Sequence, residues 1–269
     1  MNKRQSTDKE WEKWGSKDPY FGVITHNEFR SRNLTDEGKI KFFETGRDEI
    51  RHVLEVARRH LDPNFSPKKA LDFGCGVGRL VLALAEIAEH VVGVDVSKSM
   101  LREAHKNFEE RSVRNVSLLE SDDNLSSLNG LFDFILSIIV FQHIPVERGR
   151  LIFSHLLEQL EDGGIGVIQI TYAKTRYKQT HGVSPKEGVL EQFKIYKNKL
   201  KEVLRRRVYS LLRRPALGDP EMQMNPYNLN ELLFQMQESG IRDFYAEFSD
   251  HGGELGIFLY FQKPKQSSP

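Results

Sequence analysis

Short apolar runs and helical stretches alternate through the middle of the chain. The apolar runs predict strands at 69–73, 91–95, 116–120, 132–139 and 165–172. The segments between them predict helices at 79–88, 98–110 and 147–161. Strands that alternate with helices favour a parallel, doubly wound sheet. The runs 132–139 and 165–172 are apolar almost throughout, as in strands that are covered on both faces.

The flanking segments predict an N-terminal extension and an antiparallel ending. Residues 1–10 are polar and predict disorder, whereas 36–60 predicts a helix capped by Thr35, which Gly46 could bend. Residues 229–239 predict a helix, and 241–249 and 254–262 predict a hairpin at the sheet edge. The predicted fold class is α/β, a seven-stranded sheet with an antiparallel C-terminal hairpin.

A basic segment separates the last core strand from this ending. Residues 174–214 hold thirteen Lys or Arg against three Glu, and 190–214 predicts an amphipathic basic helix. Its basic face could be a solvated surface, a site for a phosphorylated or acidic acceptor, or a contact with nucleic acid or a membrane surface. We expect four parts: an N-terminal extension at 1–67, a core at 68–172, a basic insertion at 173–227 and completion of the sheet at 228–263.

Composition says more about the cellular compartment and the possible partners of the protein than about its function. The net charge of +1 gives no global attraction to nucleic acid, and no apolar run is long enough to span a membrane. The single cysteine, Cys75, excludes a disulfide framework within the chain, and no metal-ligating cluster is evident. Because the sequence starts without a leader-like segment, we expect a cytoplasmic protein. We also expect that it binds no metal. The oligomeric state stays open, a dimer included.

The candidate chemistry begins at a glycine-rich turn. The strand at 69–73 runs into Gly74, Gly76 and Gly78, and a helix follows at once. Such a turn lets a ligand approach the backbone closely and allows positive φ angles. The next strand ends at Asp95, an acid placed to accept hydrogen bonds from a ribose diol. A dinucleotide fingerprint would need a small residue where Arg79 stands.

This glycine spacing, with an acid at Asp72, resembles the S-adenosylmethionine motif of class I methyltransferases. The stretches 93–101, 120–123, 132–138 and 160–164 are similar to further motifs of that superfamily. The resemblance implies a Rossmann-like fold and S-adenosyl-L-methionine as cofactor. The resemblance implies that these residues bind the cofactor: Asp72, Gly74, Cys75, Gly76, Gly78, Asp95, Val96, Met100, Asp122, Asp123, Ser137 and Ile138.

The resemblance also suggests where a catalytic base would lie. His143 follows the fourth strand at the carboxyl edge of the sheet and could accept a proton, although a role in packing or loop hydrogen bonds is the stronger alternative there. Tyr172 and His251 are further candidates. Both tryptophans, Trp11 and Trp14, precede the core, where they could pin the N-terminus or close over the ligands.

These features predict methyl transfer to an oxygen or nitrogen of a small-molecule acceptor. A sugar, a nucleotide sugar or a natural-product intermediate would suit the chain, and a phosphate on the acceptor would explain the basic segment. One alternative is an RNA or protein methyltransferase that holds a polyanion on this segment. Another is a non-catalytic cofactor-binding protein on the same fold.

Overall fold

The computed structural model describes residues 3–184 and 218–265 and contains one mixed sheet. The strand order is β3-β2-β1-β4-β5-β7-β6, in which β1 to β5 are parallel and β7 is antiparallel to both β5 and β6. This arrangement confirms the predicted fold class, including the C-terminal hairpin. The strands are β1 (Lys69–Phe73), β2 (His90–Asp95), β3 (Val116–Glu120), β4 (Phe132–Ser137), β5 (Leu160–Lys174), β6 (Phe244–His251) and β7 (Glu254–Gln262).

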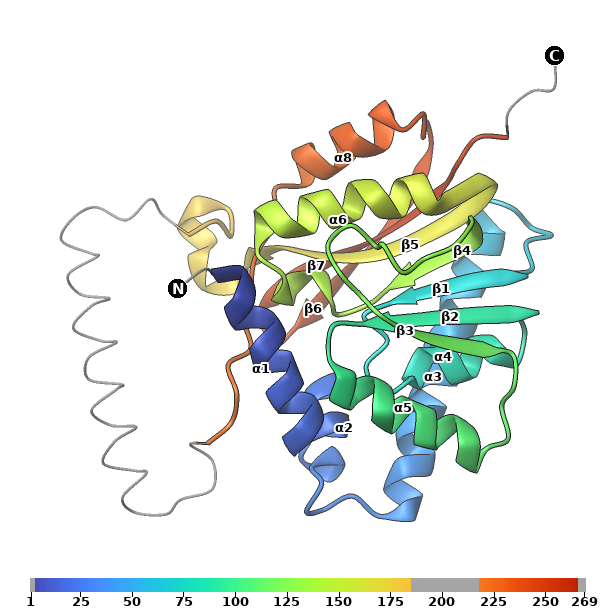
Figure 1. Cartoon of the computed structure of the whole chain (residues 1–269). Coiled ribbons are helices and arrows are strands. Elements are labelled where there is room, and N and C mark those ends of the chain that lie inside the picture. The colour runs from blue at the N-terminus through green and yellow to red at the C-terminus, as the bar shows by residue number, and fades with distance from the viewer. Residues whose placement is uncertain (1–2, 185–217, 266–269) are drawn as a thin grey trace.

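Helices cover both faces of the sheet and enclose two hydrophobic cores (Figure 1). One face carries α3 (Asp36–His60), α4 (Arg79–Ala85) and α5 (Lys98–Glu110). The other face carries α6 (Val146–Gln159) and α8 (Leu229–Glu238). Because apolar helix faces bury both sides of the central strands, the polar strand ends and loops remain at the sheet edge.

Several predicted boundaries shift for local reasons. Ile139 has a φ of +61°, so β4 ends at Ser137 instead of continuing to 139. The antiparallel partner β7 pairs with residues up to Lys174, which lengthens β5 beyond the predicted strand. Gly46 does not break α3. A Cβ there would lie 2.4 Å from the carbonyl oxygen of Arg79, so this glycine permits close packing of α3 on α4.

The predicted disorder of residues 1–10 is wrong from Lys3 onward. Helix α1 (Lys3–Lys17) and the short α2 (Pro19–Val23) lie beside the carboxyl ends of the core strands (Figure 1). The Glu12 carboxylate accepts hydrogen bonds from the Ser97 hydroxyl (2.8 Å) and the Ser99 backbone N–H (3.0 Å), both at the start of α5. Tertiary contacts therefore stabilise a helix whose own apolar pattern is weak. Three 3-10 helices complete the elements: η1 (Asn27–Phe29), η2 (Phe141–His143) and η3 (Thr175–Thr180).

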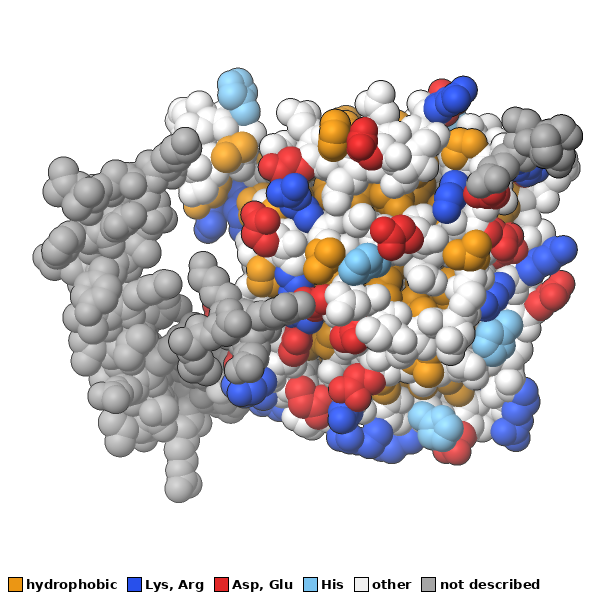
Figure 2. All heavy atoms as spheres, turned by 45° about the horizontal axis from the view of Figure 1, so that its top comes forward, with side chains coloured by type: hydrophobic (Ala, Val, Ile, Leu, Met, Phe, Trp, Pro, Cys, Tyr) orange, Lys and Arg blue, Asp and Glu red, His pale blue; other side chains and the backbone are white. Residues whose placement is uncertain are grey.

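The predicted basic helix at 190–214 lies outside the described residues, so its roles and the four-part division of the chain stay predictions. On the face shown in Figure 2, acidic and basic side chains of the described residues are intermingled. Within residues 3–184 and 218–265, every helix is too short or too polar to cross a bilayer.

Candidate functional site

The glycine turn after β1 has the backbone geometry that its sequence predicts. Gly74, Gly76 and Gly78 have φ angles of +80°, +52° and +84°. A Cβ at Gly74 would lie 2.4 Å from Val140, and one at Gly78 would lie 2.5 Å from the Phe108 ring. The turn therefore combines left-handed backbone with close packing, and both requirements exclude larger residues.

Asp95 fastens this turn to the end of β2. Its Oδ2 accepts a hydrogen bond from the Gly76 backbone N–H (2.9 Å), and its Oδ1 accepts one from the Ser97 N–H (2.8 Å). A carboxylate can accept about four hydrogen bonds, so two acceptor positions remain for a ribose diol. Burial, together with the nearby charges of Glu12 and Asp8, raises the pKa of Asp95 to about 6, against the opposing effect of its two backbone hydrogen bonds.

Asp72 presents an unsatisfied buried acceptor to the same pocket. Its side chain is 2% exposed, and its Oδ2 has no hydrogen-bond partner among the described residues. Burial raises the pKa of Asp72 to about 7, against the opposing effect of the Arg79 guanidinium. A buried acceptor without a donor is costly, so a ligand that brings a donor, such as the ammonium of S-adenosylmethionine, fits this position.

The loop after β3 places a further carboxylate at the pocket. Asp122 lines the pocket, and its Oδ1 accepts backbone hydrogen bonds from Asn124 (3.0 Å) and Ser126 (2.9 Å). These bonds lower the pKa of Asp122 and keep it ionised. Asp123, the other predicted acid, does not line the pocket but pairs with Arg148.

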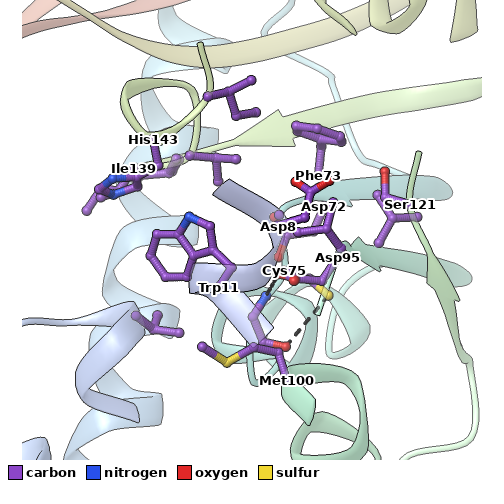
Figure 3. A pocket seen from close by; sticks show the side chains of 18 of the residues that line it. Asp8, Trp11, Asp72, Phe73, Cys75, Asp95, Met100, Ser121, Ile139 and His143 are labelled. Carbon is purple, nitrogen blue, oxygen red and sulfur yellow. Dashed lines mark hydrogen bonds between the residues drawn. The ribbon is translucent and has the colours of Figure 1, made fainter. Parts of the chain in front are cut away.

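The pocket lies between these strand ends and α1. Its free space, including the open mouth, is about 940 Å³. Ten of its lining residues are labelled in Figure 3. The predicted cofactor residues that line it are Asp72, Gly74, Cys75, Gly76, Asp95, Val96, Met100, Asp122 and Ile138.

His143 also lines the pocket, but its burial keeps it neutral. Its Nδ1 is 2.8 Å from the backbone oxygen of Gln223, which can only accept, so the proton is on Nδ1. Its Nε2 lies 3.2 Å from Gln142 Nε2 and accepts from that amide. Burial lowers the pKa of His143 to about 4. With its lone pair already occupied, His143 is poorly suited to act as a general base near neutral pH.

Four other predicted site residues do not line the pocket. Gly78 serves packing against Phe108, and the Ser137 hydroxyl donates to the Phe73 backbone oxygen (3.0 Å) within the sheet. Tyr172 packs near Phe248, and His251 lies exposed at the end of β6. Neither of these two residues lines the pocket, so the catalytic roles predicted for them stay predictions.

The N-terminal helix contributes Trp11, for which the sequence left closure over the ligands open, and two residues that sequence reasoning did not place in the site, Thr7 and Asp8. Thr7, Asp8 and Trp11 line the pocket, as does Arg148 of α6. In Figure 3 the Trp11 indole lies between His143 on one side and Asp8, Asp72 and Asp95 on the other. The ring centroids of Trp11 and His143 are 4.9 Å apart, in an edge-on contact. Trp14 is instead 3% exposed and packs in the core, so the two tryptophans have different roles.

Among the described residues, no cluster of three or more His, Cys, Asp or Glu side chains is arranged to hold a metal ion.

Known proteins share both the sequence and the fold of this core. A family model described as "Methyltransferase domain" matches residues 70–164. Over 131 residues, the chain is 32% identical to the magnesium-protoporphyrin O-methyltransferase of Synechocystis, an alignment that spans 47% of this chain and 56% of the relative. It is also 31% identical over 103 residues to the probable S-adenosyl-L-methionine-dependent methyltransferase TehB of Haemophilus influenzae, spanning 38% and 36%. The chain thus covers about half or less of the length of these relatives.

Solved structures extend the likeness in fold to nearly the whole chain. The structure of N-methyltransferase NodS from Bradyrhizobium japonicum with S-adenosyl-L-homocysteine has a TM-score of 0.57 at 13% identity and covers 97% of this chain and 100% of its own. That of magnesium protoporphyrin IX methyltransferase from Synechocystis with bound SAH has a TM-score of 0.53 at 18% identity, covering 90% and 99%.

Proposed function

We propose that this chain, which carries a class I S-adenosylmethionine-dependent methyltransferase domain, transfers a methyl group to an oxygen or nitrogen of a small-molecule acceptor. The proposal rests on one arrangement of residues that line the pocket. Asp95 accepts a hydrogen bond from the Gly76 backbone N–H, and Asp72 has a buried oxygen without a hydrogen-bond partner among the described residues. This arrangement supports binding of a ribose diol and an ammonium group in one ligand.

The residues of the chain would each hold one part of the cofactor. Asp95 accepts from the ribose, Asp122 from the adenine amino group and Asp72 from the ammonium, while Gly74 and Gly76 leave room along the backbone. The bound cofactor supplies a methyl group that its sulfonium has already activated. Holding the acceptor in line with that methyl group provides much of the rate enhancement, so a strong base is not required.

The opposite side of the pocket favours an uncharged, flat reacting group on the acceptor. Trp11, Ile139 and Val140 form an apolar wall there, and His143 adds a neutral ring. Aromatic walls of this kind bind planar groups through stacking and edge contacts. A phosphorylated or acidic portion elsewhere on the acceptor stays a prediction, because it depends on residues 190–214.

Calorimetric titration of the full chain with S-adenosylhomocysteine tests the cofactor half. We expect a dissociation constant in the micromolar range or tighter, and no detectable binding would contradict the proposal. A screen for S-adenosylhomocysteine release then tests the acceptor, with phenols and aromatic amines set against sugar phosphates. Steeply salt-dependent binding of RNA in a parallel titration would favour a nucleic-acid substrate instead.

A further inference from the structure

Helix α1 brings a polar side chain into the pocket from outside the methyltransferase domain match. Thr7 and Trp11 are four residues apart, so they share one face of the helix, and both line the pocket. Trp11 lies on the side of His143. Thr7 therefore lies one turn away from Trp11, toward the N-terminus of α1 and next to Asp8.

The Thr7 hydroxyl is buried without a partner. The residue is 4% exposed, and its Oγ1 makes no hydrogen bond to any described residue. A threonine in a helix commonly satisfies its hydroxyl on the carbonyl one turn back or in water. The Thr7 hydroxyl has no such carbonyl partner among the described residues, and Thr7 lines the pocket.

The surroundings of Thr7 identify which part of the ligand it would meet. The neighbouring Asp8 carboxylate pairs with Arg148 through two hydrogen bonds of 2.5 and 3.0 Å. Arg148 in turn pairs with Asp123, which adjoins the adenine-side acid Asp122. Asp8 also lies near enough to Asp95 to raise its pKa. Thr7 is thus fixed beside the ribose and adenine groups of the site.

We propose that Thr7 is a cofactor-binding residue whose hydroxyl hydrogen-bonds to the adenosine part of S-adenosylmethionine. Helix α1 is then one wall of the cofactor site, and it supplies a contact that the glycine turn and the strand ends cannot make. This inference rests on the proposed cofactor site and adds a residue to it.

Calorimetry with two ligands tests the assignment. S-adenosylhomocysteine carries the whole nucleoside and amino acid, whereas 5′-methylthioadenosine carries the nucleoside alone. Thr7→Val keeps the shape of the side chain and removes the hydroxyl. We expect it to weaken both ligands by the same factor, about three- to tenfold, while Thr7→Ser stays near wild type. Ser16→Ala is the control, because Ser16 lies exposed on the same helix and bonds only to the Lys13 carbonyl.

Each other outcome overturns the inference in a recognisable way. If Thr7→Val binds both ligands as wild type does, with an unchanged unfolding midpoint, Thr7 makes no cofactor contact. If it weakens S-adenosylhomocysteine alone, the contact is to the amino-acid part and the adenosine assignment is wrong. If wild type binds neither ligand, the proposed function itself fails, which distinguishes that failure from the other two.

Discussion

Asp95 accepts a hydrogen bond from the backbone N–H of Gly76, 19 positions earlier in the chain, at 2.9 Å. The bond joins the glycine turn after β1 to the acid at the end of β2. One carboxylate therefore both shapes the turn and offers its remaining acceptor positions to the pocket.

Replacement of Asp95 by Asn tests this double role. The amide has one acceptor oxygen, so it cannot accept from Gly76, Ser97 and two ribose hydroxyls together. We expect Asp95→Asn to weaken S-adenosylhomocysteine binding about 10- to 100-fold in calorimetry, equivalent to about 1–3 kcal/mol. Asp48→Asn, on the exposed side of α3, is the control. Affinity within twofold of wild type would exclude Asp95 as the ribose acceptor.

The same carboxylate predicts how cofactor affinity depends on pH. Asp95 has a pKa of about 6 in the ligand-free protein, and ribose hydroxyls require its ionised form. Binding must then release a proton below pH 6, and affinity should fall by up to about tenfold per pH unit there. Calorimetry from pH 8 to 5 measures this slope, and the Asp95→Asn variant should make it shallower, leaving the pH dependence that comes from Asp72, whose pKa is about 7. A flat wild-type profile would contradict the assignment.

We expect Asp72 to lower the stability of the ligand-free protein and to strengthen cofactor binding. Its folded pKa of about 7 is above the ordinary aspartate value of 3.8, so its contribution to stability is present below pH 3.8 and is lost as pH rises through 7. Asp72→Asn should therefore stabilise the ligand-free protein at pH 8, by on the order of 1–3 kcal/mol, and less at pH 5. Thermal unfolding at both pH values measures the gain.

The binding arm of this experiment separates function from packing. Asp72→Asn should weaken S-adenosylhomocysteine, since the amide offers no negative charge to the ammonium group. If Asp72→Asn gains the same stability over wild type at pH 8 and at pH 5, and binds S-adenosylhomocysteine as wild type does, then Asp72 has a structural role only.

Local signals in the sequence were sufficient for the core of the fold. Thr35 caps α3 as predicted, accepting a hydrogen bond from the Gly38 N–H, and Ser97 caps α5 by accepting one from the Met100 N–H. These elements follow from propensity, capping and apolar spacing within a few neighbouring residues. The positive φ angles of the glycine turn were predictable for the same reason.

The N-terminal side of the pocket could not be predicted this way. Helix α1 begins in a polar stretch with little apolar periodicity and depends on partners far along the chain, such as Ser97 for Glu12 and Arg148 for Asp8. The presence of Trp11 drew attention to this segment, but no local pattern distinguishes its place in the pocket from the core position of Trp14. Likewise, His143 was a plausible base until its Gln142 and Gln223 partners were known.

The hydrogen bonds of His143 predict its protonation state. Nitrogen NMR of the imidazole should show the proton on Nδ1 and an unprotonated Nε2 at every pH well above its pKa of about 4. Burial without a counter-charge makes the imidazolium unfavourable, which is why the ring stays neutral. Titration near the ordinary value of 6.5 would contradict the buried arrangement and would restore His143 as a candidate base.

The pairing of Asp8 with Arg148 predicts how fast the cofactor leaves. The pair joins α1 to α6 across the pocket, and the Asp8 side chain is 38% exposed, so water and salt reach it. Asp8→Asn should speed release of S-adenosylhomocysteine several-fold, because α1 then separates from α6 more readily. Stopped-flow fluorescence can follow release, since Trp11 lines the pocket.

Salt provides the internal check on this prediction. Added salt screens an exposed ion pair, so it should accelerate release from wild type and have less effect on Asp8→Asn. Lys9→Gln, an exposed change on the next residue of the helix, controls for loss of a charge from α1. If Asp8→Asn and Lys9→Gln release the ligand at the same rate as wild type at every salt concentration, the Asp8–Arg148 pair does not hold α1 over the cofactor, and cofactor exchange must follow another path.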